Sequence, residues 1–285
     1  MLNVNTHYIN YASIAILAAL FAAVANILAR LLLDGLRAKN IVGVNFLTTA
    51  VTLVVFSPLF YYFKPSLKSV LLLILIALID TLANYFYFKT FEKTEAGIAT
   101  PILSLSPAVT FLLGWLLLDD KVSGGTLVLS LSIVGLIVWF SIDRKTFRQF
   151  RFDTLLPALS AAILFGISAI PAKELLTNEA AINSPTLYMY RAALIALFSL
   201  IFFRFEISKI SFRQYKLIFI RGLFAIAQWL LLYYALSMGN AGVTVTLGNI
   251  TPIFVFILAA LFLSERITTK KVVTAIAVLI LSLLI

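Results

Sequence analysis

The chain has no cysteine and only one histidine, His7, among its 285 residues. The lack of cysteine excludes disulfides, thiolate metal sites and cysteine nucleophiles. One histidine cannot build a histidine-based metal centre, so we expect no metal site and no cofactor. Charged residues are also scarce, at 12%, whereas a soluble domain uses roughly 25% to present a wettable surface. The chain must therefore be surrounded largely by lipid.

Most of the chain consists of long apolar runs: 62% of its residues are hydrophobic, and its mean hydropathy is +1.06. Most runs are long enough to cross a hydrocarbon core about 30 Å thick, and they lack the strict alternation of barrel strands. We therefore predict an all-α integral membrane protein with ten transmembrane helices. The expected spans are 11–33, 41–63, 69–91, 96–118, 124–142, 154–175, 183–203, 215–237, 241–263 and 270–285.

Two stretches half the chain apart are similar. Residues 96–123 read AGIATPILSLSPAVTFLLGWLLLDDKVS, and residues 241–268 read AGVTVTLGNITPIFVFILAALFLSERIT, at an offset of 145 residues. The third and eighth spans align at the same offset. We predict two five-helix repeats, over 1–142 and 154–285, joined by a basic loop at 143–153. Since five is odd, the second repeat must be inverted in the membrane, an arrangement typical of alternating-access carriers with a central cavity.

The two halves resemble EamA-type domains of the drug/metabolite transporter superfamily. The resemblance is carried by 91–123 and 236–268, with their Ala-Gly start, central proline and, in the second half, the Ser-Glu-Arg ending. The first half departs from the family in having Asp119-Asp120 where a Gly-Glu pair is more usual. The resemblance covers the whole chain. It implies a secondary carrier for small metabolites, amino acids, nucleotide precursors or drugs, without indicating which.

Proline interrupts the fourth helix of each half. Pro107 and Pro252 remove the amides that would bond the carbonyls of Leu103 and Gly248. The freed carbonyls need water, a side chain or a ligand at this depth. Either nearby hydroxyls satisfy a simple kink, or the break forms the wall of a binding cavity, and both can hold. The nearby polar residues that we select as candidates are Ser104 and Asn249.

Asp80 lies near the middle of the span 69–91, where a charge costs at least about 2.5–3.5 kcal/mol. It is a candidate proton-coupling group or counter-ion for an amine. The structural alternative is a pair with an arginine of another span. Asn84 and Tyr87 follow on roughly the same helix face. We predict that Asp80 faces a central cavity lined also by spans one, four, six, eight and nine. The arginines within spans are Arg30, Arg191 and Arg221.

Span seven carries Arg191, which aligns with Asn45 of span two at an offset of 146. Its guanidinium either clamps a substrate carboxylate or extends to a lipid headgroup. Gln228 and Trp229 lie deeper in span eight than interfacial aromatic residues do, so we expect both to face the cavity.

Orientation follows from the loops. Fifteen of the 22 Lys and Arg residues lie in the loops that follow the odd-numbered spans or at the span ends next to them, and four lie on the opposite side. The positive-inside rule then places both termini outside the cell, whereas the family resemblance implies cytoplasmic termini. The expected location is a prokaryotic plasma (inner) membrane.

These features predict a secondary active transporter of a small polar metabolite. Buried charges of both signs make an amino acid or a related zwitterion a candidate substrate and the proton a candidate coupling ion. The partners expected are that substrate and the lipid bilayer, with no nucleic acid, and the protein is a monomer or a homodimer. A channel, a membrane-embedded enzyme or a scaffold is the alternative. Because the sequence has neither HExxH nor GxSxG, we do not expect an enzyme.

Overall fold

The computed structural model describes residues 3–33, 36–93, 102–118, 122–141, 152–177, 181–206, 210–262 and 269–284, which fold as helices with one isolated bridge and no strand. The first half holds α1 (Asn3–Leu33), α2 (Ala38–Phe56), the short η1 (Ser57–Leu59), α3 (Leu67–Lys93), α5 (Ser106–Leu117) and α6 (Gly124–Ser141). The second half holds α8 (Phe152–Leu176), α9 (Ser184–Phe203), α10 (Phe212–Met238), α11 (Ala241–Gly248), α12 (Thr251–Phe262) and α13 (Thr269–Leu284).

The protein is a membrane protein by the length and apolarity of its helices. Within the described ranges, seven helices are long and apolar enough to cross a membrane, and two more apolar segments, Ser106–Leu117 and Gly124–Trp139, are shorter. The expected number of ten spans is therefore not confirmed. The ninth predicted span, 241–263, is divided into α11 and α12, and only Ser106–Leu117 of the fourth is a continuous described helix.

Helix starts in the second half are fixed by local polar caps. The side chain of Asn183 accepts a hydrogen bond from the amide of Thr186 at 3.0 Å, which caps α9. Ser211 and Gln214 form a reciprocal capping box at the start of α10. Such caps satisfy amides that lack a partner within the helix, so these helices begin where the sequence provides them.

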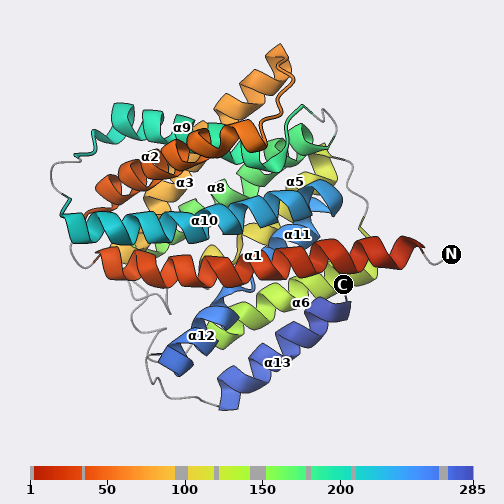
Figure 1. The fold of residues 1–285 in the computed structure, drawn as a ribbon. Coiled ribbons are helices and arrows are strands. Elements are labelled where there is room, and N and C mark those ends of the chain that lie inside the picture. The colour runs from red at the N-terminus through yellow and green to blue at the C-terminus, as the bar shows by residue number, and fades with distance from the viewer. Residues whose placement is uncertain are drawn as a thin grey trace.

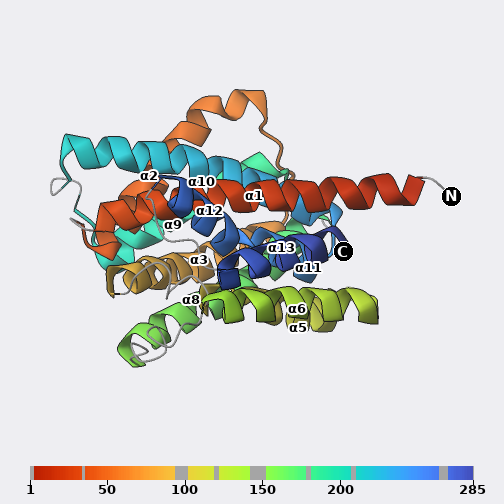
Figure 2. The ribbon, with the colours of Figure 1, turned by 90° about the horizontal axis from the view of Figure 1, so that it is seen from below.

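The main packing contacts join the two halves. Figures 1 and 2 show α1 beside α10, and α3 packs on α8 in the same way. Since α8 and α10 are the counterparts of α1 and α3, these are equivalent contacts made twice. The contacts of α1 with α12 and of α5 with α8 form a second equivalent pair, while α2 packs on α9 and α6 on α13. The start of α1 and the end of α13 lie toward the same end of the bundle (Figure 1).

A first contact between the halves, which we call clamp A, joins the chain after α2 to the start of α9. Phe63 and Ile182 form an antiparallel bridge. Beside it, the amide of Tyr62 donates to the hydroxyl of Thr186 at 3.1 Å. Clamp A therefore ties the C-terminal end of α2 to the second half.

The opposite end of α2 carries a matching contact, clamp B. The amide of Glu206, just after α9, donates to the side-chain oxygen of Asn40 near the start of α2 at 3.2 Å. Lys39 and Glu206 lie 4.0 Å apart as an exposed ion pair. The two clamps thus hold the two ends of the α2–α9 pair, one on each side of the bundle.

Candidate substrate cavity

Both halves contain a helix break at the same place in the repeat. In the second half, α11 ends at Gly248 and α12 begins at Thr251. In the first half, a turn at Ser104 and Leu105 separates the helical residues 102–103 from α5, which begins at Ser106. The two breaks coincide at the offset of 145 residues. Proline is the second residue of the helix after each break, as expected from Pro107 and Pro252.

Side chains next to the second break satisfy its backbone. The hydroxyl of Thr251 donates to the carbonyl of Gly248 at 3.1 Å, which is the group that Pro252 leaves without an amide partner. The side-chain amide of Asn249 donates to the carbonyl of Val245 at 2.8 Å. The kink is therefore satisfied by its own hydroxyl and amide groups.

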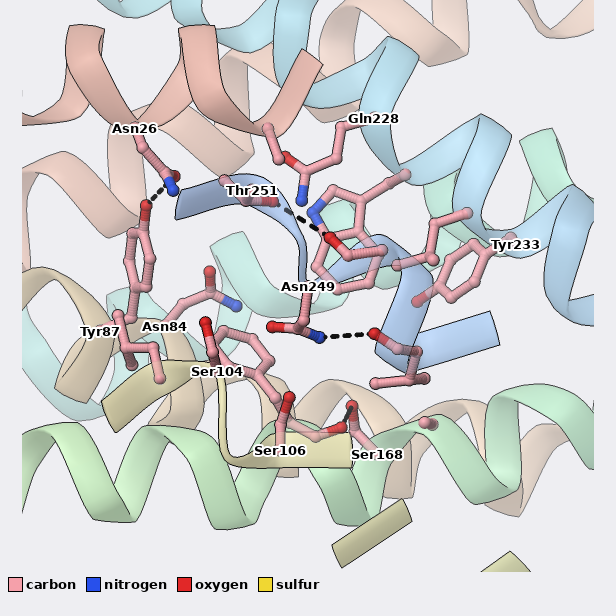
Figure 3. A pocket seen from close by; sticks show the side chains of 18 of the residues that line it. Asn26, Asn84, Tyr87, Ser104, Ser106, Ser168, Gln228, Tyr233, Asn249 and Thr251 are labelled. Carbon is pink, nitrogen blue, oxygen red and sulfur yellow. Dashed lines mark hydrogen bonds between the residues drawn. The ribbon is translucent and has the colours of Figure 1, made fainter. Parts of the chain in front are cut away.

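A cavity lies between the two breaks, so the interpretation as a cavity wall holds as well (Figure 3). It offers about 140 Å³ to the centres of water-sized molecules. At a share of about 30 Å³ for each water, this space corresponds to on the order of five waters. Its polar lining comprises Asn26, Asn84, Tyr87, Ser104, Ser106, Ser168, Arg221, Gln228, Trp229, Tyr233, Asn249 and Thr251. These residues come from spans one, three, four, six, eight and nine.

Most of the predicted site residues lie in this lining. Those that do are Ser104, Asn84, Tyr87, Gln228, Trp229 and Asn249. Figure 3 shows Tyr87 and Asn26 side by side at one edge, where the phenol hydroxyl donates to the side-chain oxygen of Asn26. Asn249 lies nearer the middle of the same view, with Ser104 to its left and Ser106 below it. Whether these residues bind substrate stays a prediction.

Asp80 and Arg191 are not in the cavity lining, contrary to our expectation for Asp80. Both side chains are fully buried, and the Nε atom of Arg191 donates to a carboxylate oxygen of Asp80. The guanidinium carbon of Arg191 lies 3.8 Å from the ring centre of Trp229, with Tyr188 and Tyr233 near by. The pair thus lies behind the cavity wall, with Trp229 between. This geometry agrees with the structural alternative for Asp80, in which its carboxylate pairs with an arginine of another span.

The charged residues at the ends of the duplicated stretches have no described position. Asp119, Asp120, Glu265 and Arg266 lie outside the described residues. Within the described ranges, no cluster of three His, Asp or Glu side chains could hold a metal ion.

Both halves of the chain match a known protein family. Residues 10–142 and 154–285 each match the EamA-like transporter family. The chain belongs to this family. Among curated proteins no sequence matches it. A solved chain titled only as the crystal structure of a protein superposes with a TM-score of 0.69 at 14% identity, over 95% of this chain and 93% of the other. That likeness shows the fold alone.

In this EamA-like transporter, equivalent positions of the two repeats meet at the cavity. Ser104 and Asn249 occupy the two breaks, and each lies 145 residues from the other. Ser106 and Thr251 form a second such pair, and Asn84 and Trp229 a third. Duplication therefore explains why the lining is drawn from matching helices, while the paired side chains have diverged in size and polarity.

Sequence reasoning missed Arg221 as a lining residue. We had considered it only as a partner for Asp80, and that place is taken by Arg191. In the structure, an NH1 group of Arg221 donates to the side-chain oxygen of Asn45 at 2.6 Å, and the side chain is 6% exposed. The signal was present, because an arginine inside an apolar span is expected to face a cavity or a partner.

Proposed function

We propose that this protein is a secondary active transporter that moves a small polar metabolite across the membrane by alternating access. The observation that carries the proposal is the pair of equivalent helix breaks, at Ser104 and Asn249, which face one cavity between the two halves. Carriers with inverted repeats bind their substrates at such broken helices near the middle of the membrane. The helix breaks and the cavity alone keep an amino acid or a related zwitterion among the candidate substrates.

The contacts between the halves suggest how access alternates. In this proposal the second repeat is inverted relative to the first, so each contact has a counterpart facing the opposite side of the membrane. Clamp A closes one side and clamp B the other. Release of one clamp while the other holds opens the cavity to one side only. Protons are the proposed coupling ion, with Asp80 as the group that exchanges them.

The test uses the absence of cysteine in the natural chain. Ser168→Cys places a reporter thiol in the cavity lining. Phe63→Cys with Ile182→Cys allows clamp A to be locked, because directly opposed strand residues are close enough for a disulfide. In vesicles, membrane-impermeant maleimide is added from either side before and after oxidation. Ser199→Cys, which is fully buried on α9, is the unreactive control.

A carrier predicts two linked changes when clamp A is locked. Labelling of the reporter from the clamp A side should disappear, and labelling from the opposite side should rise, because the protein is confined to the states open there. A channel with a gate at clamp A would lose the first signal without gaining the second. Labelling from both sides that ignores the lock would contradict alternating access.

We also propose a prokaryotic plasma membrane with both termini outside, following the loop charges. A cysteine at Asn3 should then react with impermeant maleimide in intact cells, while a cysteine at the exposed Ser211, in the loop that follows the seventh span, should not. Reaction at Ser211 alone would show that the termini are cytoplasmic, as the family resemblance implies.

A further inference from the structure

The buried charges of the described residues do not balance. Three charged side chains are buried there, Asp80, Arg191 and Arg221. Asp80 and Arg191 neutralise each other in an ion pair. The remaining charge is the guanidinium of Arg221, and no acidic residue appears in the cavity lining. The cavity therefore has a net charge of about +1 in a setting where an unpaired charge is costly.

Arg221 is held in place but has hydrogen-bonding capacity left. Its NH1 group is engaged by Asn45, and its guanidinium carbon lies 4.8 Å from the ring centre of Phe88. Its Nε atom is buried and has no hydrogen-bond partner. The partner Asn45 is a neutral amide, so it orients the guanidinium without neutralising it. Because Arg221 lines the cavity and no acid among the described residues lines it with Arg221, its charge is available to a ligand anion.

We propose that the cavity binds a small carboxylate of net charge −1, with Arg221 as its counter-ion. This inference rests on the proposed transport function and names its substrate class. A planar carboxylate matches the hydrogen-bonding geometry of a guanidinium. One negative charge neutralises the cavity, whereas an amine would raise the charge to about +2 and a zwitterion would leave it unchanged. A phosphate monoester, at about −1.5 to −2, would overcompensate.

The remaining lining fits the other end of such a molecule. Gln228 and Asn249 offer amides, and Ser104 offers a hydroxyl, for neutral polar groups of the ligand. Trp229 and Phe165 supply apolar walls. A space on the order of five waters fits carboxylates of roughly three to six carbon atoms.

The test measures binding by ligand-induced thermal stabilisation of the purified full-length protein. The probes are linear, hydroxy- and keto-monocarboxylates of roughly three to six carbons, each with its amide, its amine and its 2-amino acid counterpart, and short phosphate monoesters. At least one carboxylate should bind more tightly than all its counterparts. Equal or tighter binding of the amide, amine, amino acid or phosphate, or no binding by any carboxylate, would overturn the proposal.

Two variants locate the binding. Arg221→Gln should weaken carboxylate binding at least roughly tenfold, as loss of a hydrogen bond to a charged group predicts. Lys216→Gln removes the same charge from an exposed position on the same helix and should leave the affinity unchanged. Unchanged affinity in Arg221→Gln would contradict the assignment.

A third variant covers the case in which Arg221→Gln fails to fold. Gln228→Glu leaves Arg221 in place and adds an acid of the same shape to the lining. It should lose carboxylate binding, because the added acid neutralises Arg221 in place of the ligand, and the matched neutral amide should then bind at least as well as the carboxylate. Retained carboxylate preference would overturn the proposal. Carboxylate binding without exchange across vesicles would instead refute transport, and exchange of an amide or an amino acid alone would refute only the anion site.

Discussion

The two buried arginines of the second half, Arg191 and Arg221, differ in what holds them. Arg191 pairs with Asp80 behind the cavity wall and is surrounded by aromatic rings, including that of Trp229. Arg221 lines the cavity and is held by the neutral amide of Asn45. Both contacts cross between the halves, α3 to α9 in one case and α2 to α10 in the other. The neutralised arginine can fasten the helices, whereas the unneutralised one remains able to recognise a charge.

The comparison also shows how the repeats diverged. Arg191 occupies the place of Asn45, and Asp80 the place of Ala225, at offsets of 146 and 145 residues. The α3–α9 contact is an ion pair, whereas its counterpart between α2 and α10 has a neutral amide on α2 and an arginine one helical turn earlier on α10, at position 221. The two equivalent interfaces therefore differ in charge: the first is neutralised and the second carries an unneutralised arginine.

Removing one member of the ion pair should have the largest effect on stability. Arg191→Leu leaves the Asp80 carboxylate buried and unpaired, and we expect a loss of about 3–5 kcal/mol in the free energy of unfolding. Thermal or denaturant unfolding in detergent measures this loss. The double variant Asp80→Asn, Arg191→Leu should recover most of the loss, because no buried charge remains. If Arg191→Leu alone is as stable as the natural chain, Arg191 does not fasten the helices.

Asp80→Asn separates the structural role of this carboxyl group from the proposed coupling role. It removes the titrating group while keeping its size, and it is combined with Arg191→Leu so that no buried charge is left unpaired. We expect transport that no longer responds to a proton gradient, measured as uptake with and without a pH difference across the vesicle membrane. Transport that keeps its full response would show that Asp80 is only a member of the structural pair.

Loss of the amide that orients Arg221 should have an intermediate effect. Asn45→Leu removes a buried hydrogen bond to a charged group, which is worth about 1.5–3 kcal/mol. Stability should fall by an amount in this range, and carboxylate affinity should fall with it because the guanidinium is no longer positioned. A variant that loses stability but binds carboxylate normally would show that Asn45 does not orient the arginine for binding.

Arg221→Gln should have the smallest effect on stability, a change within about 1 kcal/mol, because loss of the hydrogen bond to Asn45 is offset by removal of an unneutralised cation from the interior. Its effect belongs to binding instead. A loss of several kcal/mol, comparable to that of Arg191→Leu, would erase the distinction between the two arginines.

Much of the fold could be predicted from the sequence because duplication and hydrophobic length are local signals. The constant offset located the prolines and therefore both helix breaks. The position of Asp80 could not be predicted in this way. It lies one helical turn before Asn84, which lines the cavity, yet its own side chain is taken by Arg191 of another helix. Which arginine neutralises an acid depends on how helices pack, and the order of residues along one helix does not contain that information.

Counterflow tests the account most directly. Vesicles containing the protein are loaded with the tightest-binding carboxylate and diluted into a trace of the same compound carrying a radioactive label. An alternating-access carrier that recognises carboxylates through Arg221 predicts a transient accumulation of label above its equilibrium level, which Arg221→Gln abolishes and Lys216→Gln preserves. Label that only rises to equilibrium, or accumulation that persists in Arg221→Gln, would contradict it.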